Sequence, residues 1–295
     1  FQPRSHPQCQ TGDRGIGEMM FRDLYCNPIP LPDMPRGFAC RFPEFGSRNY
    51  IDGKMDFREL ADPEAVYHEG KCYLYPSGRQ VYVSEDLIHW EYQELEIDHP
   101  LGYAPTVTRN SGRFLLSSSK RFDDDHARIY SGSTPLGPFR SIGRPCDRKG
   151  RPLPDFVDPM LFSDDDGRLY LYWGCAPAAG GIYCMELDPE NPVRGIGEIV
   201  KVIEFDPSNE WEHYGEYGER TQFGWDEGAS MFKHNGEYYL QYSACGTQFR
   251  RYSIAVYRGK SPMGPFRKPA RPMLRRNHGI INGTGHGGMF AGPNG

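Results

Sequence analysis

Three acidic residues, Asp62, Asp158 and Glu227, occupy corresponding places in a repeated sequence pattern. Each stands beside a Pro or Gly at the opening of an apolar run. Carboxylates that converge on a small space raise one another's pKa, and burial adds to this effect. Such a group can divide into a proton donor, a base and a third carboxylate that tunes the donor. We therefore predict that these three residues are catalytic and form an acid/base site.

A simpler explanation exists for any one of these acids. An Asp before Pro often only opens a turn, because its side chain bonds to its own backbone. Turn formation alone, however, does not require acids at the same position of separate repeats. The recurrence therefore favours the catalytic interpretation.

The repeated unit consists of an acidic or small residue, a Pro or Gly, an apolar run, a glycine-containing turn and an aromatic run. Short strands separated by turns, without helical periodicity, indicate an all-β fold. Units of three or four antiparallel strands that repeat along a chain are typical of propeller blades. We predict a five-bladed β-propeller whose equivalent positions point to the central axis, namely Asp62, Ala104, Asp158, Glu227 and His286.

The repeats also predict the domain organisation. Residues 1–55 form an N-terminal extension that packs on or closes the propeller, and residues 56–295 form the propeller catalytic domain. The fifth unit begins at Gly285 and the sequence stops at Gly295, so the fifth blade is expected to be incomplete at the C-terminus.

Composition excludes several classes of protein. The net charge of −5, with acidic and basic residues interspersed, provides no basic stripe for nucleic acid. No apolar run is long enough to span a membrane. The cysteines show no zinc-ligand spacing, and no organic cofactor is expected. The first residues lack an export leader, so a secreted or periplasmic location presumes a leader already removed, and a cytoplasmic location stays open.

Three motifs, in order, resemble glycoside hydrolase family 43: Leu60-Ala61-Asp62-Pro63, Val157-Asp158-Pro159 with the following strands, and Asp226-Glu227-Gly228 with its hairpin. The resemblance covers roughly residues 60 to 290. It implies an inverting hydrolase in which Asp62 is the general base, Glu227 the general acid and Asp158 the modulator of the acid's pKa. Inversion requires the base and the acid to lie about 6.5 to 9.5 Å apart.

The same resemblance implies a metal near His286, because a histidine at this place in the family commonly borders a hydrated calcium ion. Calcium prefers oxygen ligands, so such an ion would support the site and not act as a Lewis acid. The run Asp123–His126 is a second acidic cluster, for which a solvated loop is the favoured interpretation.

Aromatic residues flank the axial positions and could stack on a sugar ring. Trp225 directly precedes the predicted acid and is the first candidate, and Arg250 or Arg251 could donate hydrogen bonds. A place in the hydrophobic core is the alternative for each aromatic residue. The predicted substrate-binding residues are Trp225, Trp173, Tyr103, Phe156, Tyr242 and Arg251.

The resulting prediction is an exo-acting hydrolase that removes arabinofuranosyl, xylosyl or galactosyl-type residues from plant or microbial polysaccharides. The long segment before Asp62 departs from the family's usual short start and leaves the sugar open. Two alternatives are a non-catalytic carbohydrate-binding propeller and a glycoside phosphorylase of the same fold. A phosphorylase would need basic residues at the axis to hold phosphate, and the axial positions do not supply them.

Overall fold

The computed structural model describes residues 29–32, 60–99, 101–119, 128–154, 156–176 and 180–292. The predicted N-terminal extension therefore lies almost entirely outside the described residues, as does the acidic run at 123–126. The described chain is almost wholly β-structure, with one short 3₁₀ turn, η2, at Glu210–Glu212. This confirms the all-β prediction. None of the helices in these segments has the length and apolar character needed to cross a membrane.

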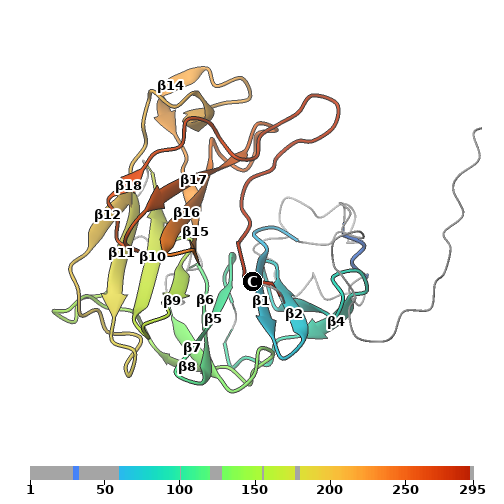
Figure 1. Ribbon diagram of the computed structural model, residues 1–295, viewed down its shortest axis with the longest axis vertical. Helices are drawn as coiled ribbons and strands as arrows, with labels where there is room; N and C mark the ends of the chain where they lie inside the picture. The colour runs from blue at the N-terminus through green and yellow to red at the C-terminus, as the bar shows by residue number, and fades with distance from the viewer. Residues whose placement is uncertain are drawn as a thin grey trace, which may run out of the picture.

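Four antiparallel sheets of four strands each follow one another along the chain (Figure 1). The first contains β1 (Glu64–His68), β2 (Lys71–Tyr75), β3 (Gln80–Ser84) and β4 (Glu91–Glu94). The second contains β5 (Thr106–Asn110), β6 (Arg113–Ser117), β7 (Ile129–Gly132) and β8 (Arg140–Gly143). The third contains β9 (Met160–Ser163), β10 (Leu169–Cys175), β11 (Gly181–Leu187) and β12 (Val200–Ile203). The fourth contains β15 (Glu227–His234), β16 (Glu237–Ala244), β17 (Ser253–Gly259) and β18 (Phe266–Arg267).

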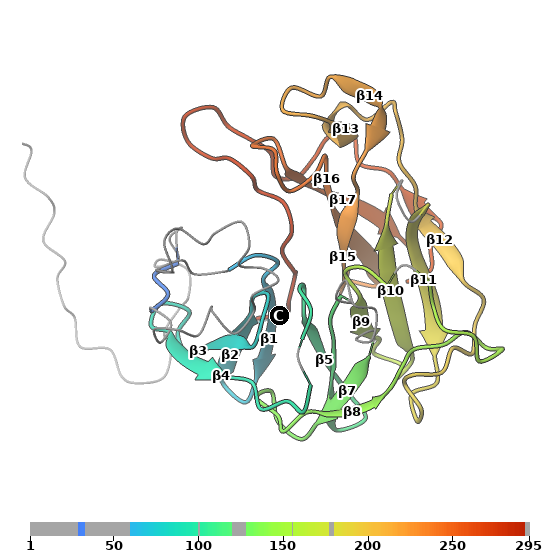
Figure 2. The same ribbon diagram turned by 180° about the vertical axis from the view of Figure 1, so that it is seen from behind.

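A two-stranded sheet, β13 (His213–Tyr214) with β14 (Arg220–Gly224), lies in the long connection between the third and fourth sheets. It stands at one end of the molecule, beyond the strands of the fourth sheet (Figures 1 and 2). The connection leads directly into Trp225 and Glu227, so it reaches the predicted site.

Tight turns connect the first two strands of the blades. In the first blade Glu69 and Gly70 have φ values of 49° and 83°, and in the fourth Asn235 and Gly236 have 50° and 71°. Two consecutive positive φ angles match the twist of an antiparallel hairpin. The sequence turns that join the apolar and aromatic runs are thereby confirmed.

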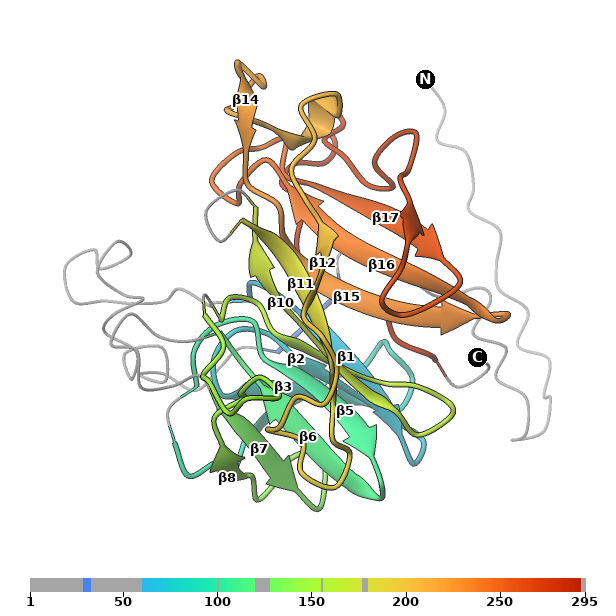
Figure 3. The ribbon, with the colours of Figure 1, turned by 90° about the vertical axis from the view of Figure 1, so that its left-hand side faces the viewer.

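Each sheet packs face to face on the next, as blades do in a propeller (Figure 3). The third and fourth blades share a buried cluster that includes Tyr172, Met231 and Tyr242, and similar clusters join the first blade to the second and the second to the third. Burial of each large side chain stabilises the fold by about 1.5–3 kcal/mol. The innermost strands β1, β5, β9 and β15 contact one another in sequence around the axis.

The prediction of five blades is not confirmed, because the described residues form four four-stranded blades. The C-terminal segment runs between the first and fourth blades without forming a strand (Figure 2). Its Gly288 N–H donates to the carbonyl of Pro63 at 2.8 Å, and its Met289 N–H donates to Ser230 at 3.2 Å. The segment therefore brings His286 to the axis, as the repeat predicted, although the described residues form no complete fifth sheet around it.

Candidate active site

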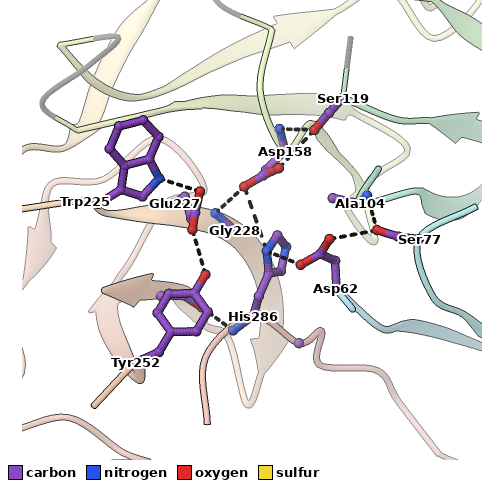
Figure 4. Close-up of polar contacts among 12 residues, drawn as sticks. Asp62, Ser77, Ala104, Ser119, Asp158, Trp225, Glu227, Gly228, Tyr252 and His286 are labelled. Atoms are coloured by element: carbon purple, nitrogen blue, oxygen red, sulfur yellow. Dashed lines mark hydrogen bonds and ion pairs between the residues drawn. The ribbon is translucent and has the colours of Figure 1, made fainter. Parts of the chain in front are cut away.

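One residue in each repeat adopts a left-handed backbone conformation near the axis. Asp62, Ala104 and Asp158 lie just before the innermost strands of their blades, and Gly228 is the second residue of β15. The φ angles are 56° at Asp62, 50° at Ala104, 45° at Asp158, 65° at Gly228 and 51° at His286. Positive φ is unfavourable for residues with a Cβ atom, so its recurrence marks a required geometry. Figure 4 shows that the side chains of Asp62, Asp158 and His286 converge.

The structural repeat corrects the sequence register in the fourth blade. Gly228, and not Glu227, takes the left-handed position that Asp62 and Asp158 hold in their blades. Glu227 instead pairs with Ser243, as Ala61 pairs with Ser77 one residue before Asp62. The prediction that all three acids share one register is therefore wrong for Glu227. The irregularity in strand pairing between Glu227 and Ser230 explains why simple motif alignment missed this offset.

Gly228 is required where it stands. A Cβ atom there would lie 2.9 Å from Cδ2 of His286, and the residue also has positive φ. The close approach lets the N–H of Gly228 donate to Oδ2 of Asp158 at 3.2 Å. The one-residue offset therefore places the backbone N–H of Gly228 at the axis. The carboxylate of Glu227 still faces the cluster formed by Asp62, Asp158 and His286 (Figure 4).

Serine hydroxyls at the end of the second strand join neighbouring blades. Ser77 donates to Oδ2 of Asp62 at 2.7 Å and accepts from the N–H of Ala104 at 2.9 Å. Ser243 accepts from the N–H of His286 at 2.7 Å. These serines were not predicted, although a serine at or just after the second strand of the first, second and fourth blades was a detectable signal. They fix the axial residues of adjacent blades relative to each other.

Asp158 is held by a third such serine. Ser119 donates to its Oδ1 at 2.9 Å and accepts from its backbone N–H at 2.7 Å. Burial raises the pKa of Asp158, and the charge of Asp62 adds to the rise, while His286, Ser119 and Gly228 oppose it. Asp158 is therefore a rigid, buried carboxyl group between the other two acids.

His286 lies between the carboxylates of Asp62 and Asp158. Its Nδ1 is 3.0 Å from Oδ1 of Asp62 and 3.8 Å from Oδ2 of Asp158. Burial alone would lower the pKa of His286, but the charges of Asp62, Asp158 and Glu227 raise it to about 10. The ring is consequently an imidazolium near neutral pH.

Asp62 is the acid best suited to act as a base. Burial would raise its pKa, but the charge and hydrogen bond of His286, with the hydrogen bond from Ser77, bring the pKa below the ordinary value. Asp62 is therefore ionised at neutral pH and able to accept a proton.

Glu227 has the opposite tendency. Burial, followed by the charge of Asp158, raises its pKa to about 7 against the effects of His286, Trp225 and Tyr252. Trp225 Nε1 donates to Oε2 at 2.6 Å, and the Tyr252 hydroxyl donates to Oε1 at 2.8 Å. Two side chains thus orient a carboxyl group that keeps its proton close to neutrality. Tyr252 was not predicted, because no spacing in the sequence relates it to Glu227.

Two predicted substrate-binding residues lie at this group. Trp225 is partly exposed and contacts Glu227 through its indole N–H. Tyr103 is also partly exposed, and its hydroxyl hydrogen-bonds to Ser119. Burial raises the pKa of Tyr103, and the charges of Asp158 and Glu227 raise it further. Both side chains therefore border the carboxylates.

Three other predicted substrate-binding residues are in the core, which corrects that part of the prediction. Phe156, Trp173 and Tyr242 are at most 1% exposed. Trp173 donates to the carbonyl of Pro154 at 3.1 Å. Because their rings are covered by neighbouring blades, they have no face open for a sugar. Their positions in strands with aromatic runs could not distinguish core from rim.

Arg251 lies beside Tyr252 but is directed elsewhere. Its guanidinium donates to the backbone carbonyl of Glu210 at 2.6 Å, in a separate cleft of about 890 Å³ lined also by Trp211 and Tyr217. The neighbouring Arg250 pairs with Glu216 at 2.6 Å. Neither arginine is hydrogen-bonded to the carboxylates of the axial group.

The residues around His286 do not fit direct calcium coordination. Within the described ranges no cluster of three or more His, Cys, Asp or Glu side chains is arranged to hold a metal. Nδ1 of His286 faces Asp62, and calcium takes six to eight oxygen ligands. The imidazolium itself supplies positive charge between the carboxylates. The calcium ion stays a prediction.

A propeller with an ionised carboxylate, a protonated glutamic acid and an intervening third acid has the parts of a glycoside hydrolase. Residues 58–295 match the family model described as Glycosyl hydrolases family 43. The chain belongs to this family, and it is a glycosidase.

Several characterised proteins are similar to this chain. A β-D-galactofuranosidase of Aspergillus niger is 27% identical, over 78% of this chain and 69% of the relative. An extracellular endo-α-(1→5)-L-arabinanase of Bacillus subtilis is 31% identical, over 72% and 51% respectively, and a xylan 1,3-β-xylosidase of a Vibrio species is 28% identical, over 71% and 40%. The chain thus spans about half or less of the last two relatives.

Solved structures give the same fold. The crystal structure of a thermostable family-43 glycoside hydrolase superposes with a TM-score of 0.65 at 26% identity, covering 84% of each chain. An endo-1,4-β-xylanase from Bacteroides thetaiotaomicron superposes with a TM-score of 0.63 at 26% identity, covering 80% of this chain and 82% of that one.

Proposed function

We propose that this protein is an inverting, exo-acting glycosidase that removes terminal arabinofuranosyl, xylosyl or galactosyl-type residues from plant or microbial polysaccharides. The observation that carries the proposal is the contrast between two acids at one site. Oδ1 of Asp62 lies 3.0 Å from Nδ1 of His286, whose charge lowers the pKa of Asp62. Glu227, in contrast, is held by Trp225 and Tyr252 where burial raises its pKa to about 7. One acid is then ionised while the other is protonated, as acid/base cleavage of a glycosidic bond requires.

In the proposed reaction, Asp62 takes a proton from water while the water oxygen attacks the anomeric carbon. Glu227 gives its proton to the glycosidic oxygen, and the bond from that oxygen to the anomeric carbon breaks. Figure 4 places Asp62 and Glu227 on opposite sides of the group, with Asp158 and His286 between them. This arrangement supports a single displacement with water between base and sugar.

Asp158 and His286 have supporting roles in this proposal. Asp158 raises the pKa of Glu227 by its charge, and His286 keeps Asp62 ionised. Trp225 and Tyr103 border the space where the terminal sugar would lie. His286 is the one basic side chain among the described residues that line the axial space, which does not favour a phosphate nucleophile.

Exo action is supported by the rim of the propeller. The connection that carries β13 and β14 and the loop at residues 271–283 both stand beyond the strands of the fourth blade (Figure 1). Loops of this kind can wall a pocket against the middle of a polysaccharide. A secreted or periplasmic location is part of the proposal, supported by two relatives described as extracellular.

The test is a panel of four aryl glycosides with linear arabinan and xylan beside it. We expect release of p-nitrophenol from α-L-arabinofuranoside, β-D-xyloside, β-D-galactofuranoside or β-D-galactoside, and no early fall in polymer length. A rapid fall in polymer length with no aryl release would contradict exo action. Binding to the polymers without any hydrolysis would instead support the non-catalytic propeller and overturn the proposed activity.

A further inference from the structure

A second pair of acids lies buried behind the active site. Glu212, from η2, and Asp226, which directly precedes Glu227, are both 0% exposed. Their carboxyl groups are in hydrogen-bonding contact with each other. Two carboxylates without a proton between them would repel strongly in such a place. One of the two must therefore be protonated.

The hydrogen bonds of Glu212 identify it as the ionised member. Its Oε1 accepts from the Tyr242 hydroxyl at 2.5 Å and from Asn209 Nδ2 at 2.6 Å, and its Oε2 accepts from the backbone N–H of Asp206 at 2.7 Å. Three donors on one carboxyl group favour the charged form.

Asp226 has the opposite surroundings. No donor from the described part of the chain reaches either of its carboxyl oxygens. The titratable groups that interact with it are Glu212, Glu227, Tyr242, Tyr257 and Cys245, none of them a cation. As a carboxylic acid, Asp226 can donate to the carboxylate of Glu212.

The backbone of Asp226 is fixed as well. Its N–H donates to the carbonyl of Ala176 at 2.8 Å, and its carbonyl accepts from the N–H of Ala176 at 2.9 Å. The hydrogen bond from the Asp226 side chain to Glu212 adds a link to the connection between the third and fourth blades. The residue that precedes Glu227 is thus held by both the third blade and this connection.

We propose that Asp226 is a positioning residue for Glu227: as a carboxylic acid it donates a hydrogen bond to Glu212 and so fixes the chain where Trp225 leads into Glu227, the first residue of β15. The inference rests on the proposed function only for the role of Glu227. The shared proton between Asp226 and Glu212 can be tested without any substrate.

The test compares Asp226→Asn with the wild type by thermal unfolding between pH 5 and pH 8. Burial raises the pKa of Asp226 well above its ordinary value, with the charge of Glu212 adding to the rise. The folded protein then keeps a proton that the unfolded chain releases, so the wild type loses stability as the pH rises. Asparagine donates to Glu212 at every pH. We expect Tm of the variant relative to the wild type to increase by about 2–3 °C per pH unit.

Asp164→Asn is the matched control, because Asp164 is also buried but is ionised. It accepts from Lys233 and from the Tyr238 hydroxyl, both at 2.5 Å, and the pKa of Asp164 is below its ordinary value. Its contribution to stability is present above the ordinary pKa, so this variant should be less stable by a constant amount from pH 5 to pH 8. If the difference in Tm between Asp226→Asn and the wild type were also independent of pH, the proposal that Asp226 and Glu212 share a proton would be overturned.

The positioning role is tested by activity on the best aryl glycoside. We expect Asp226→Asn to keep kcat within about threefold, whereas Asp226→Ala should lose about tenfold to a hundredfold in kcat with little change in KM. Equal impairment of the two variants would overturn the role. If the wild type hydrolyses nothing, the proposed function fails, while the pH dependence of Tm still decides the state of Asp226.

Discussion

Replacing Glu227 by Gln is expected to lower kcat/KM about 10³-fold on substrates with a sugar or alkyl leaving group, equivalent to about 4 kcal/mol of transition-state stabilisation. Such leaving groups need a proton from the general acid. A 2,4-dinitrophenyl group leaves without one, so the same variant should lose much less activity on a dinitrophenyl glycoside. The size of the loss should therefore follow the basicity of the leaving group.

The pH dependence of kcat/KM provides a second test of the role of Glu227, again with the variant Glu227→Gln. Because the pKa of Glu227 is about 7, kcat/KM of the wild type should fall as the pH rises through 7 and the acid loses its proton. The fall on the acidic side should come below the ordinary pKa of an aspartic acid, because the pKa of Asp62 is lowered. The alkaline fall should be absent in Glu227→Gln.

The exposed Glu190→Gln is a matched control and should change neither kcat/KM nor its dependence on pH. An equal loss for all leaving groups would contradict the assignment.

Replacing Asp62 by Asn is expected to lower kcat/KM by about 10³ to 10⁴ whatever the leaving group, because water must be deprotonated in every case. Azide carries its own charge and needs no base. It should therefore restore turnover of the variant on an activated glycoside, giving a glycosyl azide of inverted configuration.

The controls for this variant are azide with the wild type and azide with Glu227→Gln, where the base is intact. Azide should have little effect on the wild type. A glycosyl azide of retained configuration from Asp62→Asn, or full activity of that variant without azide, would contradict the role of Asp62 as base. In Asp62→Asn the amide oxygen can accept from His286, and the amide N–H can donate to the Ser77 hydroxyl, which donates to Asp62 in the wild type, so loss of folding is not expected.

The repeat in the sequence was sufficient to predict the blades and their hairpins. Asp62, Asp158 and His286 could be placed at the axis because each repeat opens with the same small motif. Glu227 lies at the predicted site, but one residue before the position in the repeat that the sequence alignment gave it. Its offset depends on a pairing irregularity and on a contact between Gly228 and His286, which come from residues far apart in the chain.

Aromatic residues were harder to interpret. Trp225 and Trp173 both stand near axial motifs, yet one borders Glu227 and the other is buried under Tyr183 and Pro154. Which face of a strand is covered depends on the neighbouring blade, and a single repeat does not carry that information. The pair of Glu212 and Asp226 was equally hidden, because its partners meet only after the connection between blades has folded back.

The most direct test of a single displacement at these carboxylates is the configuration of the first product. We would follow hydrolysis of the best aryl glycoside by ¹H NMR and assign the anomeric signal before mutarotation. We expect the first sugar released to have the anomeric configuration opposite to that of the substrate. A first product with retained configuration would mean a glycosyl-enzyme intermediate and would contradict the roles of Asp62 and Glu227 proposed here.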